Sequence, residues 1–132
     1  MLHKLLILAA AAAMSVAAQS SAGRLVAKVP FPFEVNGKAM PAGSYEFVRP
    51  PQGKAVVIRS RVDPATRVAV LSGEAEYRRE SNELVFRRYG TRYFLGEIQY
   101  AGRNVSVRMP VAKGERELAR TERPERVVTY AD

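Results

Sequence analysis

The sequence predicts an all-β protein: a single antiparallel β-sandwich or flattened barrel of about 7–8 strands with a short charged helix near the C-terminus. Short runs rich in Val, Phe and Tyr alternate apolar and polar residues, which is the period of half-buried strands. Gly, Pro and Asn interrupt these runs at roughly ten-residue intervals. Helical periodicity is absent until the C-terminal part. The chain of 132 residues has room for one domain.

The first element is a secretory signal peptide within residues 1–22. Lys4 supplies a positive charge, Leu5–Met14 an apolar core, and Val16–Ala18 small residues suited to signal peptidase. A membrane-spanning helix needs roughly 20 apolar residues, and polar residues interrupt this run too early. We therefore expect a signal peptide over 1–18, ending at residue 22 at the latest. The mature protein would be exported, periplasmic or extracellular, and would meet the membrane only through this segment before cleavage.

A β domain is expected over residues 23–110. Its first strand is predicted from Lys28–Asn36, where apolar side chains alternate strictly with charged residues and prolines. Pro30 and Pro32 fall on the outer face of this segment, and proline cannot donate to a strand ladder, so we expect an edge strand. Asn36-Gly37 is a strong signal for a type I′ hairpin turn, because both residues tolerate positive φ.

Six further strands follow, separated by turns at Met40–Gly43, Asp63-Pro64, Gly90-Thr91 and Ala101-Gly102. Alternation places Leu84 and Phe86 on the core side of their strand and Arg87 on the outside. The expected strands are one around Tyr45 and Phe47, then Ala55–Ser60, Arg67–Leu71, Leu84–Tyr89, Arg92–Tyr100 and Asn104–Met109.

The composition changes over residues 111–132, which we expect to form a charged helix and tail. Ala112–Arg123 consists of helix formers with almost no apolar face, and Pro124 ends them. The helix should be short and peripheral, because only Val111, Leu118 and Ala119 could dock it. Arg126–Tyr130 would add a last edge strand or remain a tail.

Three ordered motifs resemble a group of small exported proteins of Gram-negative soil bacteria. They are VPFPFEVNGKAMPAGSYEF at 29–47, LVFRRYGTRYFLGEI at 84–98 and GERELAR at 114–120. The group is similar in its signal peptide, its PAGxY hairpin, its FxRYGxRYFL hairpin and its RELA-like C-terminal helix. The resemblance implies export and β architecture, and it implies no particular activity.

The composition removes most catalytic chemistry from the mature chain. There is no Cys or Trp, and the one His, His3, lies in the expected signal peptide. Ser-His-Asp and Cys-His catalysis, zinc held by Cys or His, haem ligation by His and disulfides are therefore excluded. We expect a non-catalytic protein without cofactor or metal, whose role is that of an envelope or extracellular module.

Arginine is the residue type that points to a partner. After the signal segment the chain has 16 Arg and 4 Lys, and the formal net charge of the whole chain is +8. A planar guanidinium binds carboxylate, phosphate or sulfate in a bidentate manner. The candidate anion-binding residues are Arg78, Arg79, Arg87 and Arg92, although a plain solvated surface is the simpler interpretation. The expected partner is an acidic glycan, another envelope component or a protein, and export argues against specific binding of nucleic acid.

Two alternatives to a binding module stay open. A carboxylate-only hydrolase would need two of the clustered acidic residues Glu74, Glu76, Glu80 and Glu83, although surface ion pairing explains them as well. A carrier of a small apolar ligand would need an aromatic-lined cavity, whereas a domain of this size needs the same side chains to fill its core. The aromatic residues concerned are Phe31, Phe33, Tyr45, Phe47, Phe86, Tyr93 and Phe94.

Overall fold

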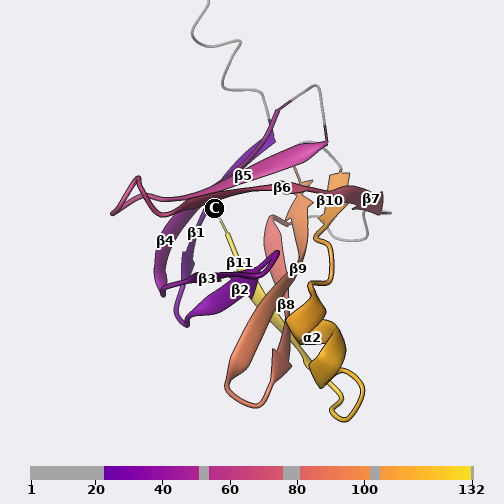
Figure 1. The fold of residues 1–132 in the computed structure, drawn as a ribbon. Coiled ribbons are helices and arrows are strands. Elements are labelled where there is room, and N and C mark those ends of the chain that lie inside the picture. The colour runs from indigo at the N-terminus through magenta and orange to yellow at the C-terminus, as the bar shows by residue number, and fades with distance from the viewer. Residues whose placement is uncertain (1–22, 51–53, 76–80, 102–104, 132) are drawn as a thin grey trace, which may run out of the picture.

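The computed structural model describes residues 23–50, 54–75, 81–101 and 105–131, and these form two packed β-sheets and one short helix (Figure 1). The predicted signal peptide over 1–18 lies outside the described residues. Among those that are described, no helix combines the length and apolar character needed to cross a bilayer.

The prediction of an all-β fold with a short helix near the C-terminus is confirmed. One sheet has the strand order β1-β4-β5-β6; the other has the order β11-β8-β9-β10-β7 and also holds the β2–β3 hairpin beside β9. The elements are β1 (Gly23–Val29), β2 (Phe33–Val35), β3 (Lys38–Met40), β4 (Gly43–Arg49), β5 (Ala55–Ser60), β6 (Arg67–Leu71), β7 (Gly73–Ala75), β8 (Glu83–Tyr89), β9 (Arg92–Tyr100), β10 (Val105–Arg108), α2 (Lys113–Leu118) and β11 (Glu125–Tyr130).

The described residues form eleven strands, more than the expected seven or eight. Three of the additional elements, β2, β3 and β7, have only three residues each and lie in segments rich in turn residues. The residues Arg126–Tyr130 belong to β11, which pairs with β8 and so extends the larger sheet at its edge.

The predicted single strand over Lys28–Asn36 is in fact the passage from one sheet to the other. Its first residues end β1, which pairs with β4, and its last residues form β2. Between them the prolines interrupt the ladder, as expected for residues without an N–H. Because the chain crosses between the sheets here, β2 meets β9 in parallel, with Glu34 opposite Phe94, in an otherwise antiparallel structure.

The tight turns agree with their sequence signals. Asn36 and Gly37 have φ values of 49° and 81° between β2 and β3, which is the positive-φ pair that a type I′ turn requires. Gly90 has a φ of 61° between β8 and β9, as the first central residue of a type II′ turn requires. At the β5–β6 turn the Asp63 side chain accepts hydrogen bonds from the Ala65 N–H and the Thr66 hydroxyl.

The interior between the sheets is filled by side chains from both of them. Phe33, Tyr45, Phe47 and Phe86 are at most 2% exposed, and Phe31 and Tyr93 pack against this cluster. These aromatic residues are therefore core residues. Phe94 is also buried, but it lies on the opposite side of β9 from the core residue Leu95.

Helix α2 docks on the larger sheet through a charged residue, which corrects the expectation that only Val111, Leu118 and Ala119 could dock it. The Glu115 side chain is 3% exposed, and it accepts hydrogen bonds from the guanidinium of Arg87 on β8 through both of its carboxylate oxygens. The Tyr89 hydroxyl donates a third bond to it, at 3.1 Å. In Figure 1, α2 accordingly lies against β8 and β9 on the side away from β1 and β4.

Gly96 makes room for this contact. It is the additional residue of a bulge in β9, since Val85 pairs with Glu97 whereas Phe86 pairs with Leu95. A Cβ at Gly96 would collide with the Arg87 guanidinium. The bulge thus gives the arginine the space from which it reaches the helix.

We predict that Glu115→Gln lowers the free energy of unfolding by about 1–3 kcal/mol, because the partly buried Arg87 guanidinium would lose its charged partner. The measurement is chemical denaturation, with hydrogen exchange of the α2 amides as a local readout. Glu117→Gln makes the same chemical change at an exposed position of the same helix and should alter stability by less than about 0.5 kcal/mol. Equal effects of the two variants would show that Glu115 does not hold the helix.

A second prediction concerns the bulge. Gly96→Ala should displace Arg87 from Glu115 and destabilise the protein by about 1–2 kcal/mol. In a protein that already carries Glu115→Gln, the same substitution should cause a much smaller loss of stability, because the contact is already weakened. Gly73→Ala is the control, because a Cβ there meets nothing within 4 Å. Full additivity of the Gly96→Ala and Glu115→Gln effects in a double-mutant cycle would contradict the proposed coupling.

Candidate functional site

Arg87 and Arg92, two of the four arginines singled out in the sequence, are engaged with carboxylates of this chain. Arg87 binds Glu115, and this hydrogen bond raises the pKa of Arg87 further above its ordinary value. Arg92 binds Glu34 on β2 in a bidentate pair, with both N–O distances 2.9 Å. The other two, Arg78 and Arg79, lie outside the described residues.

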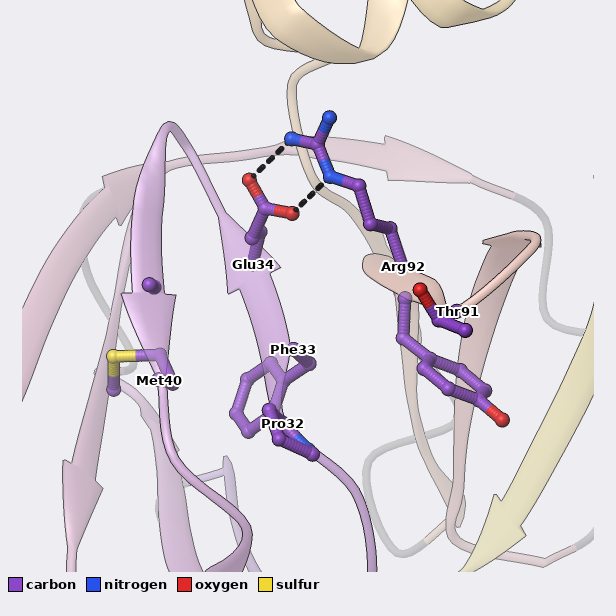
Figure 2. Close-up of a pocket in the computed structure, with 8 residues that line it drawn as sticks. Pro32, Phe33, Glu34, Met40, Thr91 and Arg92 are labelled. Atoms are coloured by element: carbon purple, nitrogen blue, oxygen red, sulfur yellow. Dashed lines mark hydrogen bonds and ion pairs between the residues drawn. The ribbon is translucent and has the colours of Figure 1, made fainter.

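A small pocket lies beside the Arg92–Glu34 pair (Figure 2). Its volume is about 170 Å³, and it lies between the β2–β3 hairpin and the turn that joins β8 to β9. Apolar side chains such as Phe33 and Met40 line most of it, and among the described residues the charged groups that line it are Glu34 and Arg92. Because these two charges satisfy each other, the pocket offers no open charge to a ligand.

The end of the β8–β9 hairpin also carries a cation on an aromatic stack. The rings of Phe31 and Tyr93 stack with their centroids 3.7 Å apart, and the Arg88 guanidinium lies 5.5 Å from the Tyr93 centroid. Arg88 is exposed at the surface and lies 3.8 Å from a carboxylate oxygen of Glu125. The β8–β9 end thus presents one exposed cation, Arg88, which already has Glu125 as an ion-pair partner.

A larger concentration of positive charge lies on the outer face of the four-stranded sheet. The inward side chains of β1, β4, β5 and β6 belong to the core, so the alternate residues of these strands point outward. We call this surface the basic face. It consists of five cations, Arg24, Lys28, Arg59, Arg61 and Arg67, around one carboxylate, Glu46.

Strand register brings these charges together from three hairpin-connected strands and β1. Glu46 on β4 lies opposite Val26 on β1 and opposite Arg59 on β5, and Arg59 lies opposite Arg67 on β6. Neighbouring strands are about 4.8 Å apart. Arg59 and Arg67 therefore share one row across the sheet with Glu46, and Lys28 and Arg61 flank Ser44 in the next row.

Glu46 neutralises only part of this charge. Its Oε1 is 3.0 Å from Arg24 Nε and 3.4 Å from a terminal nitrogen of Arg59. The hydrogen bond from Arg24 lowers the pKa of Glu46 below its ordinary value, and the charges of Arg24, Arg59 and Arg61 act in the same direction. Glu46 is thus ionised at neutral pH, and the basic face keeps an excess of cations even when Asp63, in the same connection as Arg61, is counted with Glu46.

Three cations of the basic face have no carboxylate partner in the part of the chain that the structure describes. Lys28, Arg61 and Arg67 form no ion pair within 4.0 Å there. All three are exposed. They differ in this from Arg87 and Arg92, whose guanidiniums are already bound by carboxylates.

Two of the four acidic residues considered for a hydrolase, Glu74 and Glu83, lie among the described residues, and they do not form a pair with each other. Glu74 is exposed on β7, whereas Glu83 is 1% exposed on β8. Two strands, β9 and β10, separate β7 from β8 in the sheet, so the two residues are on the order of 14 Å apart across it. Glu76 and Glu80 lie outside the described residues. Three pockets lined by described residues each have at most one carboxylate in their wall.

One pattern in the sequence does indicate the basic face, namely the alternation of cations with apolar residues in β1. The adjacent arginines singled out in the sequence lie elsewhere in the chain, so this pattern was not used. In β1, Arg24 and Lys28 fall at the positions that alternate with buried Leu25, Ala27 and Val29. Periodicity indicates that such residues share one face of their own strand. It does not indicate which strands are neighbours, so the combined charge of the sheet became visible only with the strand order.

The functional interpretation rests on the excess of positive charge on the basic face. Guanidinium and ammonium groups at exposed strand positions attract anions and need no further group to do so. Comparison of the chain with protein-family models, with curated proteins and with solved structures gave no match.

Proposed function

We propose that this protein is a non-catalytic exported module that binds an acidic polymer through the basic face. The observation that carries the proposal is the ratio of five cations to one carboxylate on one side of a four-stranded sheet. Four of the five cations are arginines, whose planar guanidinium suits carboxylate, sulfate and phosphate groups alike. Such groups recur along acidic glycans.

The shape of the basic face favours an extended ligand. Its cations lie on both sides of β4, on β1 and on or just after β5 and on β6, and Arg24 and Lys28 are about 13 Å apart along β1 at roughly 3.3 Å per residue. A single small anion cannot contact all of them. A linear polymer with repeated anionic groups can contact several at once, and the contacts then reinforce one another.

The positions of the described residues favour a binding role over a hydrolase or a carrier of a small apolar ligand. Glu74 and Glu83 are too far apart to act on one glycosidic bond, for which two carboxyl groups about 5–9.5 Å apart are needed. The aromatic residues that a ligand carrier would use fill the core. A protein partner with an acidic surface would also fit the basic face, but the spread of the cations favours the polymer.

We predict that the double variant Arg59→Gln, Arg67→Gln lowers the affinity for polygalacturonate about tenfold at low salt, a loss of about 1.4 kcal/mol. The loss follows from removing two neighbouring cations of the basic face, on β5 and on the edge strand β6. Calorimetric titration at low and high salt provides the measurement. The affinity of the unaltered protein should fall with rising salt, because mobile ions screen these contacts.

The matched control is Arg120→Gln, Arg123→Gln. It removes the same net charge from two exposed residues beyond α2 and should change the affinity by less than twofold. An equal loss in both double variants would mean that net charge alone attracts the polymer, and the proposal would then fail. It would also fail if acidic polymers did not bind at any salt concentration.

Export is tested at the N-terminus. When the full chain is expressed in a Gram-negative host, mass spectrometry of the protein should find a mature form that begins at Gln19, and no later than Gly23. The variant Lys4→Glu removes the positive charge that precedes the apolar segment and should slow this processing. A protein that keeps Met1 and stays inside the cell would contradict the proposed location.

A further inference from the structure

One corner of the basic face is hollowed into a pocket of about 330 Å³. It lies where β1 meets the end of β11, and β11 belongs to the other sheet. This volume is at the lower end of the range of small-ligand sites, about 300–1,000 Å³. The lining residues are Val26, Ala27, Lys28, Ser44, Arg61, Tyr130 and Ala131.

The polar groups of this pocket suit an anion. Lys28 lies directly opposite Ser44 in the β1–β4 ladder, and the Arg61 N–H donates a 2.9 Å hydrogen bond to the Ser44 carbonyl oxygen. Three adjacent strand positions therefore bring an ammonium, a hydroxyl and a guanidinium to one place. No carboxylate lines the pocket, and neither cation has an ion-pair partner among the described residues.

The larger sheet supplies the aromatic wall. Tyr130 is the last residue of β11 and lies opposite Glu83 of β8. The next residue, Ala131, donates its N–H to the Asn82 carbonyl oxygen at 3.0 Å and packs against the core. Tyr130 is thereby held at the rim of the pocket while its side chain remains 68% exposed. An exposed tyrosine ring is an apolar surface with a hydroxyl at its tip.

We propose that this pocket binds a sugar that carries one anionic group. The carboxylate or phosphate of the sugar lies between Lys28 and Arg61, and the ring of Tyr130 contacts the sugar ring. The inference rests on the proposed function, because it assigns one unit of the acidic polymer to a defined place. The inference goes beyond the proposed function in one respect. A short ligand should bind in this pocket even when it contacts no other part of the basic face.

The test is an NMR titration of the purified protein with D-galacturonate, glucose 6-phosphate and inorganic phosphate. Both sugars should shift the amide signals of Ser44, Arg61 and Tyr130, whichever of the two anions they carry. Arg61→Gln and Lys28→Gln should each weaken this binding at least tenfold. Arg24→Gln removes the same charge from the far end of β1 and should change it less than twofold.

Tyr130→Ala separates recognition of the sugar from recognition of the anion. It should weaken binding of both sugars at least fivefold and leave binding of inorganic phosphate unchanged. An equal effect on all three probes would overturn the role of the tyrosine ring and with it the assignment of a sugar.

The polymer titration distinguishes failure of the pocket from failure of the proposed function. If polygalacturonate binds but the small sugars cause no shifts at the pocket, the inference is wrong and the proposed function stands. The inference is equally wrong if Arg24→Gln and Arg61→Gln weaken sugar binding alike. If neither polymer nor sugar binds, both proposals fail.

Discussion

The shared core of the two sheets is the constraint on which the rest of the structure depends. Phe47 and Ile58 are fully buried within it, so the residues next to them in sequence, Glu46 and Arg59, must point outward. A shift of register by one residue would bring charged side chains into the core and apolar ones to the surface. The core thus fixes which side chains form the basic face. Most of these charged side chains are carried by strands, so binding to them does not require a loop to become ordered.

The two sheets use arginine in different ways, and the proposed function rests on this difference. On the larger sheet α2 covers part of the outer surface, so Arg87 is partly buried and needs Glu115 as its partner. The desolvation of such a guanidinium is offset only by a well-placed anion. On the smaller sheet Arg61 and Arg67 are exposed, and neither forms an ion pair among the described residues. The same residue type therefore holds a helix in place on one side of the molecule and is available to a ligand on the other.

Local patterns in the sequence predicted much of the fold, whereas contacts between distant segments were beyond them. Ala55–Ser60 and Arg67–Leu71 form strands with the predicted bounds, because alternation and turn residues act within a few positions of the chain. The division of Lys28–Asn36 between two sheets escaped prediction, since the same alternation fits one strand or two. The docking of Glu115 escaped it for another reason: a charged residue appears solvent-exposed until its partner, here 28 positions earlier in the chain, is known. The proposed site differs from the arginines singled out in the sequence, because the strand order decides which arginines lie side by side and local patterns do not contain it.

If the basic face of the β1-β4-β5-β6 sheet is the binding surface, an acidic polymer must contact its residues, and a map of these contacts tests this. Backbone amide signals of the protein, recorded with and without polygalacturonate, provide this map. We expect the changes to concentrate on β1, β4, β5 and β6 and to be small on β8, β9 and α2. Changes that centre on the β8–β9 hairpin around Arg88 and Arg92, with an undisturbed four-stranded sheet, would contradict the proposal.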